Sequence, residues 1–148
     1  LQYTDYTLAF DHDSILNRFL LNNVLTKDNT EAVALNKNKL KLTPSLFYND
    51  AIVLKHIASD QINLSAEKDE HGLIISFRGF PYFGIWAAKG APFVCLEPWC
   101  GIADNIHHNY QLTVKKALTN SPQVRPGKEH GAWSYFNDAS SRFFKSLI

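Results

Sequence analysis

The chain has 148 residues, of which 45% are hydrophobic and 20% charged, which is ordinary for one globular domain with a core of its own. The formal net charge is +1 and the Lys and Arg residues are scattered, which argues against nucleic acid as the main partner, because phosphate binding needs a concentrated basic face. No apolar run approaches the roughly 20 residues that a membrane-spanning helix needs, so we expect no membrane partner either.

Short alternating segments separated by turn residues fill the first third of the chain. Residues 6–10 alternate strand-forming residues and predict a strand, and the polar residues 11–14 predict a turn. Residues 15–21 fit a short helix or a strand, and their neighbours favour a strand. We expect a further turn at 28–30 and a short strand at 32–35.

One helical turn interrupts this pattern. Thr43 can cap a short helix that has Pro44 at its first position. The segments that follow predict an antiparallel hairpin and its neighbours: strands at 51–56, 61–66 and 73–78, with a hairpin loop at 67–72.

The second half is richer in aromatic residues. We expect a strand at 80–86, a short strand at 93–97 broken by Pro98, a surface loop over 99–110 and a last strand at 132–136. Many short strands with regular turns indicate an all-β fold, an antiparallel β-sandwich, rather than βαβ units. We expect residues 1–148 to form a single β-sandwich domain.

Glu97 is the residue most suited to chemistry. If its segment is a strand, Phe93, Cys95 and Glu97 share one face, and the carboxylate lies partly desolvated beside Trp99. Partial desolvation suits a general base that works near neutral pH. The alternative is a carboxylate at a strand end that forms an ion pair with a nearby Lys or Arg and has no other role.

Several strings of the sequence carry a resemblance to a known family. They are Leu-Phe-Tyr-Asn-Asp-Ala at 46–51, Phe-Pro-Tyr-Phe-Gly-Ile-Trp at 80–86, Gly-Ala-Pro-Phe-Val-Cys-Leu-Glu-Pro-Trp-Cys-Gly-Ile-Ala-Asp at 90–104 and Pro-Gly-Lys at 126–128. In this order they resemble the C-terminal half of the LacX-like branch of the aldose 1-epimerase (galactose mutarotase-like) family. The resemblance covers about residues 5 to 137, and its Phe-Val-Cys-Leu-Glu-Pro-Trp string, shortly after Gly-Ile-Trp, is specific.

The resemblance implies a large antiparallel sandwich, often called a supersandwich, that interconverts the α and β anomers of aldoses without a cofactor. In that family a glutamate takes the proton of the anomeric hydroxyl while a histidine protonates the ring oxygen, and Glu97 stands at the position of the glutamate. The implied partner is a hexose or a hexose phosphate. Whether the chain turns it over, as an isomerase in carbohydrate metabolism, stays open at this point.

Three further residues are candidates for substrate binding. Asp50 corresponds to the family's acceptor for sugar hydroxyls, although an Asp after one helical turn is as often a turn residue. Trp86 and Trp99 each adjoin a turn and either stack on a sugar ring or fill the core; we favour Trp86 as the sugar platform.

We expect neither a metal site nor a disulfide. Asp104, His107 and His108 are close in sequence, but adjacent histidines point apart and no further ligand has suitable spacing. Cys95 and Cys100 would close a very tight loop, and the start of the chain shows no secretory pattern, so free thiols and a cytoplasmic location are expected.

The chain also departs from the family. The catalytic histidine of the family lies upstream of the strand that residues 6–10 resemble, and full members have about twice this length, so we expect the C-terminal portion of a longer chain. Such a portion would be a poor mutarotase alone and could form a homodimer to cover its strand edges. Two rivals remain: a carbohydrate-binding or sugar-sensing module without turnover, and a sandwich that binds only protein.

Overall fold

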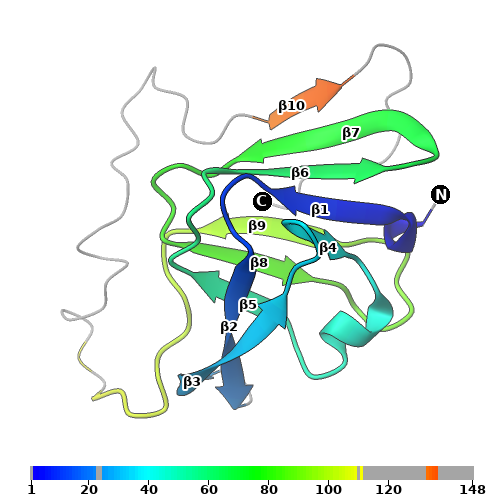
Figure 1. Ribbon diagram of the computed structural model, residues 1–148. Helices are drawn as coiled ribbons and strands as arrows, with labels where there is room; N and C mark the ends of the chain where they lie inside the picture. The colour runs from blue at the N-terminus through cyan, green and yellow to red at the C-terminus, as the bar shows by residue number, and fades with distance from the viewer. Residues whose placement is uncertain (1, 23–24, 110, 112–132, 137–148) are drawn as a thin grey trace.

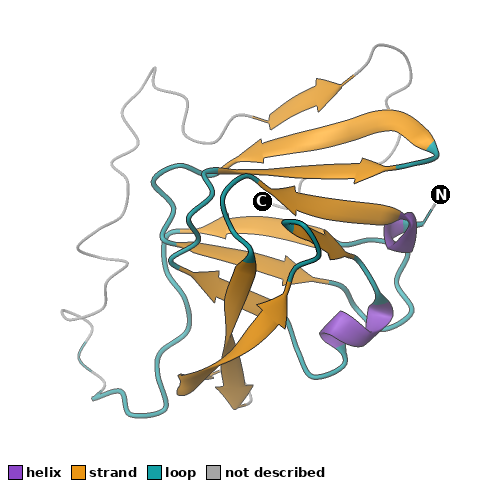
Figure 2. Ribbon diagram, in the orientation of Figure 1, coloured by secondary structure: helices purple, strands orange, loops and turns teal. Residues whose placement is uncertain are grey.

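The fold consists almost entirely of β-strands (Figures 1 and 2). The computed structural model describes residues 2–22, 25–109, 111 and 133–136. Two 3₁₀ helices accompany the strands, η1 (Tyr3–Asp5) and η2 (Pro44–Phe47). The strands are β1 (Tyr6–Phe10), β2 (Ile15–Asn22), β3 (Leu25–Ala34), β4 (Lys39–Lys41), β5 (Ile52–Lys55), β6 (Gln61–Ala66), β7 (Asp69–Ser76), β8 (Tyr82–Trp86), β9 (Cys95–Trp99) and β10 (Trp133–Phe136).

The strands form two antiparallel sheets. The first sheet has the order β10-β7-β6-β1-β4, and the second has the order β3-β2-β5-β8-β9. All pairings between these strands are antiparallel, as in the register Leu8↔Leu64 of the first sheet and Leu54↔Phe83 of the second. The predicted antiparallel β-sandwich is therefore confirmed.

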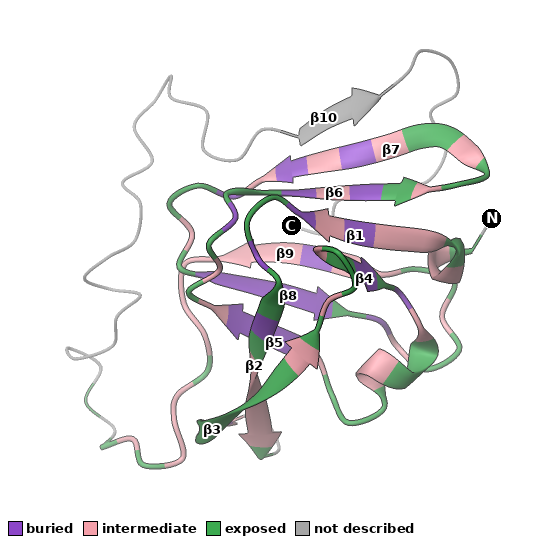
Figure 3. Cartoon of the chain, in the orientation of Figure 1, coloured by how far each residue is buried: buried purple, intermediate pink, exposed green. Residues whose placement is uncertain are grey.

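The core lies between the two sheets, and buried residues alternate with less buried ones along β1, β6 and the second half of β7 (Figure 3). The largest fully buried side chain is Phe83 of β8, whose ring centroid lies 4.8 Å from that of Phe77 after β7. The inward residues of both sheets are Leu8, Phe10, Ile62, Leu64, Leu73 and Ile75 on one side and Leu16, Ile52, Leu54, Phe83, Ile85 and Leu96 on the other. Leu73, Ile75 and Phe77 are all buried in this core.

The edge strands correct two expectations. Residues 28–30 do not form a turn; they continue β3, which pairs with β2 from Leu25 to Ala34 and carries its polar side chains on an exposed outer strand. Pro98 does not end its strand, because β9 is the last strand in the order of the second sheet and Pro98 pairs with Phe83 there. An edge strand tolerates proline, since the missing N–H would point away from the sheet.

Two smaller expectations need adjustment as well. The β6–β7 hairpin loop is shorter than residues 67–72, because β7 already begins at Asp69. Thr43 precedes η2, and Pro44 is its first residue as predicted, but the Thr43 hydroxyl lies 2.9 Å from the Ser45 hydroxyl and does not cap a backbone N–H.

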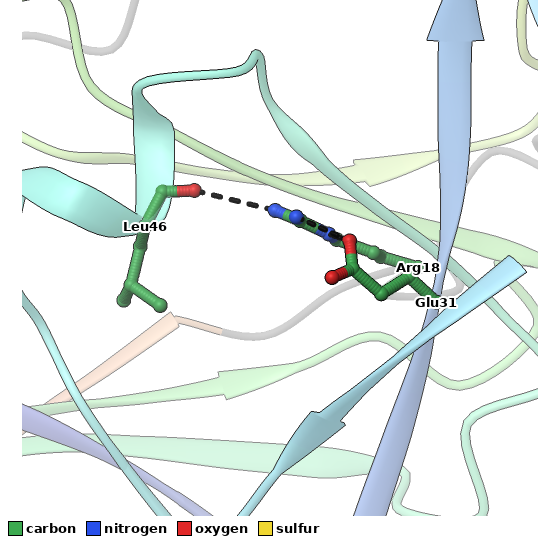
Figure 4. A network of polar contacts seen from close by, with 3 residues as sticks. All are labelled: Arg18, Glu31 and Leu46. Atoms are coloured by element: carbon green, nitrogen blue, oxygen red, sulfur yellow. Dashed lines mark hydrogen bonds and ion pairs between the residues drawn. The ribbon is translucent and has the colours of Figure 1, made fainter.

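A polar contact fastens η2 to the second sheet (Figure 4). Arg18 of β2 donates from Nε to the Glu31 carboxylate of β3 at 2.9 Å and from Nη1 to the Leu46 carbonyl of η2 at 3.5 Å. The segment between β4 and β5 contains η2 and ends with Asp50 shortly before β5. Among the described residues, no helix is long and apolar enough to cross a membrane.

Candidate functional site

The candidate site lies on the outer face of the second sheet, the face that points away from the first sheet. On β9, Leu96 points into the core, so Cys95, Glu97 and Trp99 point outward by strand alternation. The cross-strand pairs are Gly84↔Glu97, Trp86↔Cys95 and Tyr82↔Trp99, and residues directly opposite each other share a face. The structure therefore places three of the four candidate residues from the sequence on one surface: Glu97, Trp86 and Trp99.

Glu97 is half-buried on this surface, as the sequence predicts for a strand beside Trp99. Its Oε2 accepts a hydrogen bond of 3.0 Å from the indole Nε1 of Trp99, and the thiol of Cys95 also hydrogen-bonds to its carboxylate. Both partners are uncharged. In the described part of the chain no Lys, Arg or His forms an ion pair with Glu97, so the simple ion-pair alternative has no partner there.

The pKa of the Cys95 thiol is affected by the negative charge of the neighbouring Glu97. Burial raises the pKa of the Cys95 thiol, and the charge of Glu97 and the hydrogen bond to it raise this pKa further. The thiol therefore stays protonated at neutral pH and donates to the carboxylate rather than acting as a nucleophile. Cys95 and Cys100 are both free thiols, which confirms that expectation.

Trp99 lies across the neighbouring strand, over Gly84. A Cβ atom on Gly84 would meet Cζ2 and Cη2 of the indole at 2.6 and 2.7 Å, distances that real Cβ atoms do not adopt. The glycine thus makes room for the ring. Sequence reasoning missed this function of Gly84, and the signal available was a glycine between large apolar residues of a strand.

Trp86 ends β8 as an exposed aromatic residue. It is 39% exposed, and its ring stands edge-on to that of Phe93, with centroids 6.3 Å apart; Phe93 is 47% exposed. We call these two residues the aromatic corner. Alternation in the sequence predicts that Phe93 shares a face with Cys95 and Glu97. The structure adds its contact with Trp86.

Asp50 is the fourth candidate and does not join the others through any contact among the described residues. It precedes β5, near the end of β8 that carries Trp86, since Ile52 pairs with Ile85. Its side chain is exposed, and Oδ1 accepts a hydrogen bond of 2.7 Å from the backbone N–H of Ala51. Its φ of 143° is a conformation that side-chain-bearing residues rarely adopt.

The loop after β9 is attached to the opposite edge of the same sheet. Thr26 of β3 donates its N–H to the Asp104 carbonyl at 2.9 Å and accepts from the Ile106 N–H at 3.0 Å. His107 Nε2 lies 3.4 Å from the Asp28 carboxylate. In the described residues, no three His, Cys, Asp or Glu side chains gather as a metal site would need.

A cavity of about 150 Å³ lies beyond the Tyr82 end of β8 and contains none of the four candidates. Its lining residues are His56, Ile57, Phe77, Phe80, Pro81 and Tyr82. Glu97 therefore lies on the outer face of the second sheet and does not line this cavity.

Comparison with known proteins agrees with this architecture. A galactose mutarotase-related enzyme from Lactobacillus acidophilus superimposes with a TM-score of 0.71 at 26% identity, covering 93% of this chain and 47% of that one. A galactose mutarotase-like protein from Lactobacillus casei ATCC 334 has a TM-score of 0.62 at 23% identity, covering 89% of this chain and 44% of that one, which shows the shared fold. No family model matches the chain.

Sequence relatives support the same family. The chromosomal and plasmid LacX proteins of Lactococcus lactis subsp. lactis are each 31% identical to this chain over 122 residues. These matches support a LacX-like, aldose 1-epimerase-like family for this chain. The predicted resemblance is thereby confirmed. The match covers 80% of this chain and 41% of each LacX protein, so the chain spans about two-fifths of the length of these relatives.

Proposed function

We propose that this chain carries the base-bearing face of an aldose 1-epimerase-like site, which binds a hexose or hexose phosphate and interconverts its α and β anomers. Glu97 acts as the general base in this proposal, and Trp86 and Asp50 contact the sugar. The observation that carries the proposal is the half-buried Glu97 carboxylate, held on the outer face of the second sheet by uncharged donors only.

The environment of Glu97 supports a proton-accepting role. An ammonium or guanidinium partner would neutralise the carboxylate and weaken it as a base, whereas an indole N–H and a thiol fix its position and leave its charge in place. One strand away, the aromatic corner of Trp86 and Phe93 offers an exposed apolar surface. Such surfaces suit the apolar face of a sugar ring.

The proposed reaction is a proton relay around a ring opening. The Glu97 carboxylate takes the proton of the anomeric hydroxyl, the O–H electron pair forms the C1=O1 double bond, and the bond between C1 and the ring oxygen breaks. The ring oxygen takes a proton from an acid group. Rotation about C1–C2 and the reverse sequence then close the ring as the other anomer, so that no atom is gained or lost.

A sugar-binding module without turnover is the second candidate. Among the described residues, no histidine hydrogen-bonds to Glu97 or to Trp99. The family's mechanism needs a histidine acid on the other side of the sugar. A face that binds the sugar through Trp86, Phe93 and Glu97 but lacks this acid would recognise a hexose without changing it.

Polarimetry separates these functions. We expect the chain to speed the optical-rotation change of freshly dissolved α-galactose or α-glucose only slightly over buffer, because a portion of the family fold is a poor mutarotase alone, and Glu97→Gln to abolish this acceleration. Glu67→Gln is the matched control, because Glu67 is an exposed glutamate in the β6–β7 turn of the other sheet. Sugar binding without acceleration would support the module, and neither binding nor acceleration would contradict both proposals.

A further inference from the structure

The second tryptophan of the site makes a contact that a sugar platform would not need. Trp99 and Glu97 are two residues apart on β9, so their Cα atoms lie about 6.6 to 7 Å apart along the strand. Side chains in this relation usually stand parallel. Here the indole instead leans across β8 to lie over Gly84, which is the residue directly opposite Glu97.

This diagonal placement depends on the glycine. Trp99 pairs directly with Tyr82, and Gly84 is its diagonal neighbour on β8. Because Gly84 has no Cβ, the ring can approach the backbone of β8 and bring Nε1 to 3.0 Å from Glu97 Oε2. With an alanine at position 84, Cζ2 and Cη2 would have to move, and Nε1 would move with them.

From this arrangement we infer that Trp99 is a positioning residue for Glu97, with Gly84 as the space that allows it, and that Trp99 does not form the sugar platform. The inference rests on the proposed function of Glu97 as the base. The indole N–H occupies one lone pair of Glu97 Oε2, and the carboxylate keeps further lone pairs with which it can accept the proton of the anomeric hydroxyl.

The donor type fits this role. An indole N–H only donates and carries no charge, so it orients the carboxylate without competing for the proton that the base must accept. The Cys95 thiol hydrogen-bonds to the same carboxylate from the other side along the strand. Two neutral donors at i−2 and i+2 therefore restrict the rotation of the Glu97 side chain.

The two tryptophans consequently have separate roles. One face of the Trp99 ring is closed by the Gly84 backbone, whereas Trp86 is 39% exposed and meets Phe93 only edge-on. Trp86 is thus the tryptophan available for stacking, which agrees with the sequence-based preference for Trp86 as the platform.

A spectroscopic test follows the hydrogen bond without relying on activity. The indole N–H resonances are recorded by ¹⁵N NMR at neutral pH and assigned with Trp99→Phe and Trp86→Phe. We expect Glu97→Gln to shift the Trp99 indole resonance, because it removes the charged acceptor, and to leave the Trp86 indole resonance unaffected. A Trp99 indole resonance that Glu97→Gln leaves unchanged would overturn the inference.

Kinetics then separate positioning from sugar contact. Trp99→Phe keeps the ring and removes the donor, so kcat should fall about 10- to 100-fold with KM changed less than about twofold. Gly84→Ala should act in the same direction, and circular dichroism checks that both variants fold. A raised KM with unchanged kcat would show that Trp99 contacts the sugar and overturn the inference.

The result that would contradict the proposed function differs from the result that would contradict the positioning role of Trp99. Anomerisation by the wild-type chain that Glu97→Gln leaves unchanged, while the Trp99 indole resonance still responds to Glu97→Gln, would reject Glu97 as the base. An active wild-type chain whose Trp99→Phe variant keeps both constants would reject the positioning role alone.

Discussion

The outer faces of the two sheets differ in composition although both cover the same core. The first sheet carries short polar side chains on its outer face, such as Thr7, Asn63, Ser65 and Ser76. The outer face of the second sheet at β8 and β9 carries large rings, a thiol and one half-buried carboxylate. A single acid among aromatic residues on an outer sheet face lies outside the shared core, which is why we propose this face as the site.

The largest effect should come from the core that both sheets share. Phe83→Ala removes the largest fully buried side chain and should lower the free energy of unfolding by about 3 to 5 kcal/mol. Phe93→Ala, in the aromatic corner, should cost less than about 1.5 kcal/mol, because Phe93 is 47% exposed. Urea unfolding measures both; equal losses would contradict the division between core and site.

Gly84→Ala should give an intermediate effect. Its Cβ would meet the Trp99 ring at 2.6 Å, so we expect a loss of about 1 to 3 kcal/mol. Adding Trp99→Ala should remove much of this cost, with a coupling of about 0.5 to 3 kcal/mol in a double-mutant cycle. Ser76→Ala on the first sheet is the control and should stay within about 0.5 kcal/mol. Strictly additive losses at positions 84 and 99 would show that the ring does not lie over Gly84.

The smallest effect concerns a pH-sensitive contact of the first sheet. The Tyr6 hydroxyl donates to the Asp69 carboxylate at 2.7 Å, and His71 donates to the same carboxylate. Burial and the contact with Asp69 raise the pKa of Tyr6 from 10.0 to about 12. The hydrogen bonds from Tyr6 and His71 lower the pKa of Asp69 from 3.8 to about 2.

These two pKa shifts determine the pH ranges in which the contact between Tyr6 and Asp69 stabilises the fold. The contribution of Tyr6 is present below pH 10 and is lost as the pH rises toward 12, whereas that of Asp69 is present above pH 3.8 and is lost as the pH falls toward 2. Tyr6→Phe should flatten the alkaline loss of stability and weaken the acid one. The exposed Tyr48→Phe is the control. An unchanged pH profile of the unfolding midpoint in Tyr6→Phe would contradict this.

Alternation along strands was the part of the structure that the sequence could predict. The strands at 6–10 and 61–66 have the predicted bounds, because one face of each is apolar and buried. Residues 28–30 and Pro98 were misassigned because turn-forming residues are also tolerated on edge strands, and the sequence does not say which strands are at an edge.

The candidate site was proposed from its residues, but its contacts could not be predicted from the sequence. Alternation places Glu97 and Trp99 on one face, and the pairing of β8 with β9 adds Trp86. The hydrogen bond from Trp99 to Glu97 depends on Gly84 of another strand, and the contact of Phe93 with Trp86 depends on the loop between β8 and β9. Such cross-strand relations require the register, which no single segment contains.

The central claim is that the outer face of β8 and β9 binds a hexose, and resonance mapping tests it most directly. Galactose and glucose are titrated separately into ¹⁵N-labelled chain while backbone amide and indole signals are followed. We predict saturable shifts of the Trp86 and Trp99 indole signals and of the β9 amides, with β6 and the outer face of the first sheet unchanged. Shifts confined to the first sheet, or no saturable shifts with either sugar, would contradict the claim.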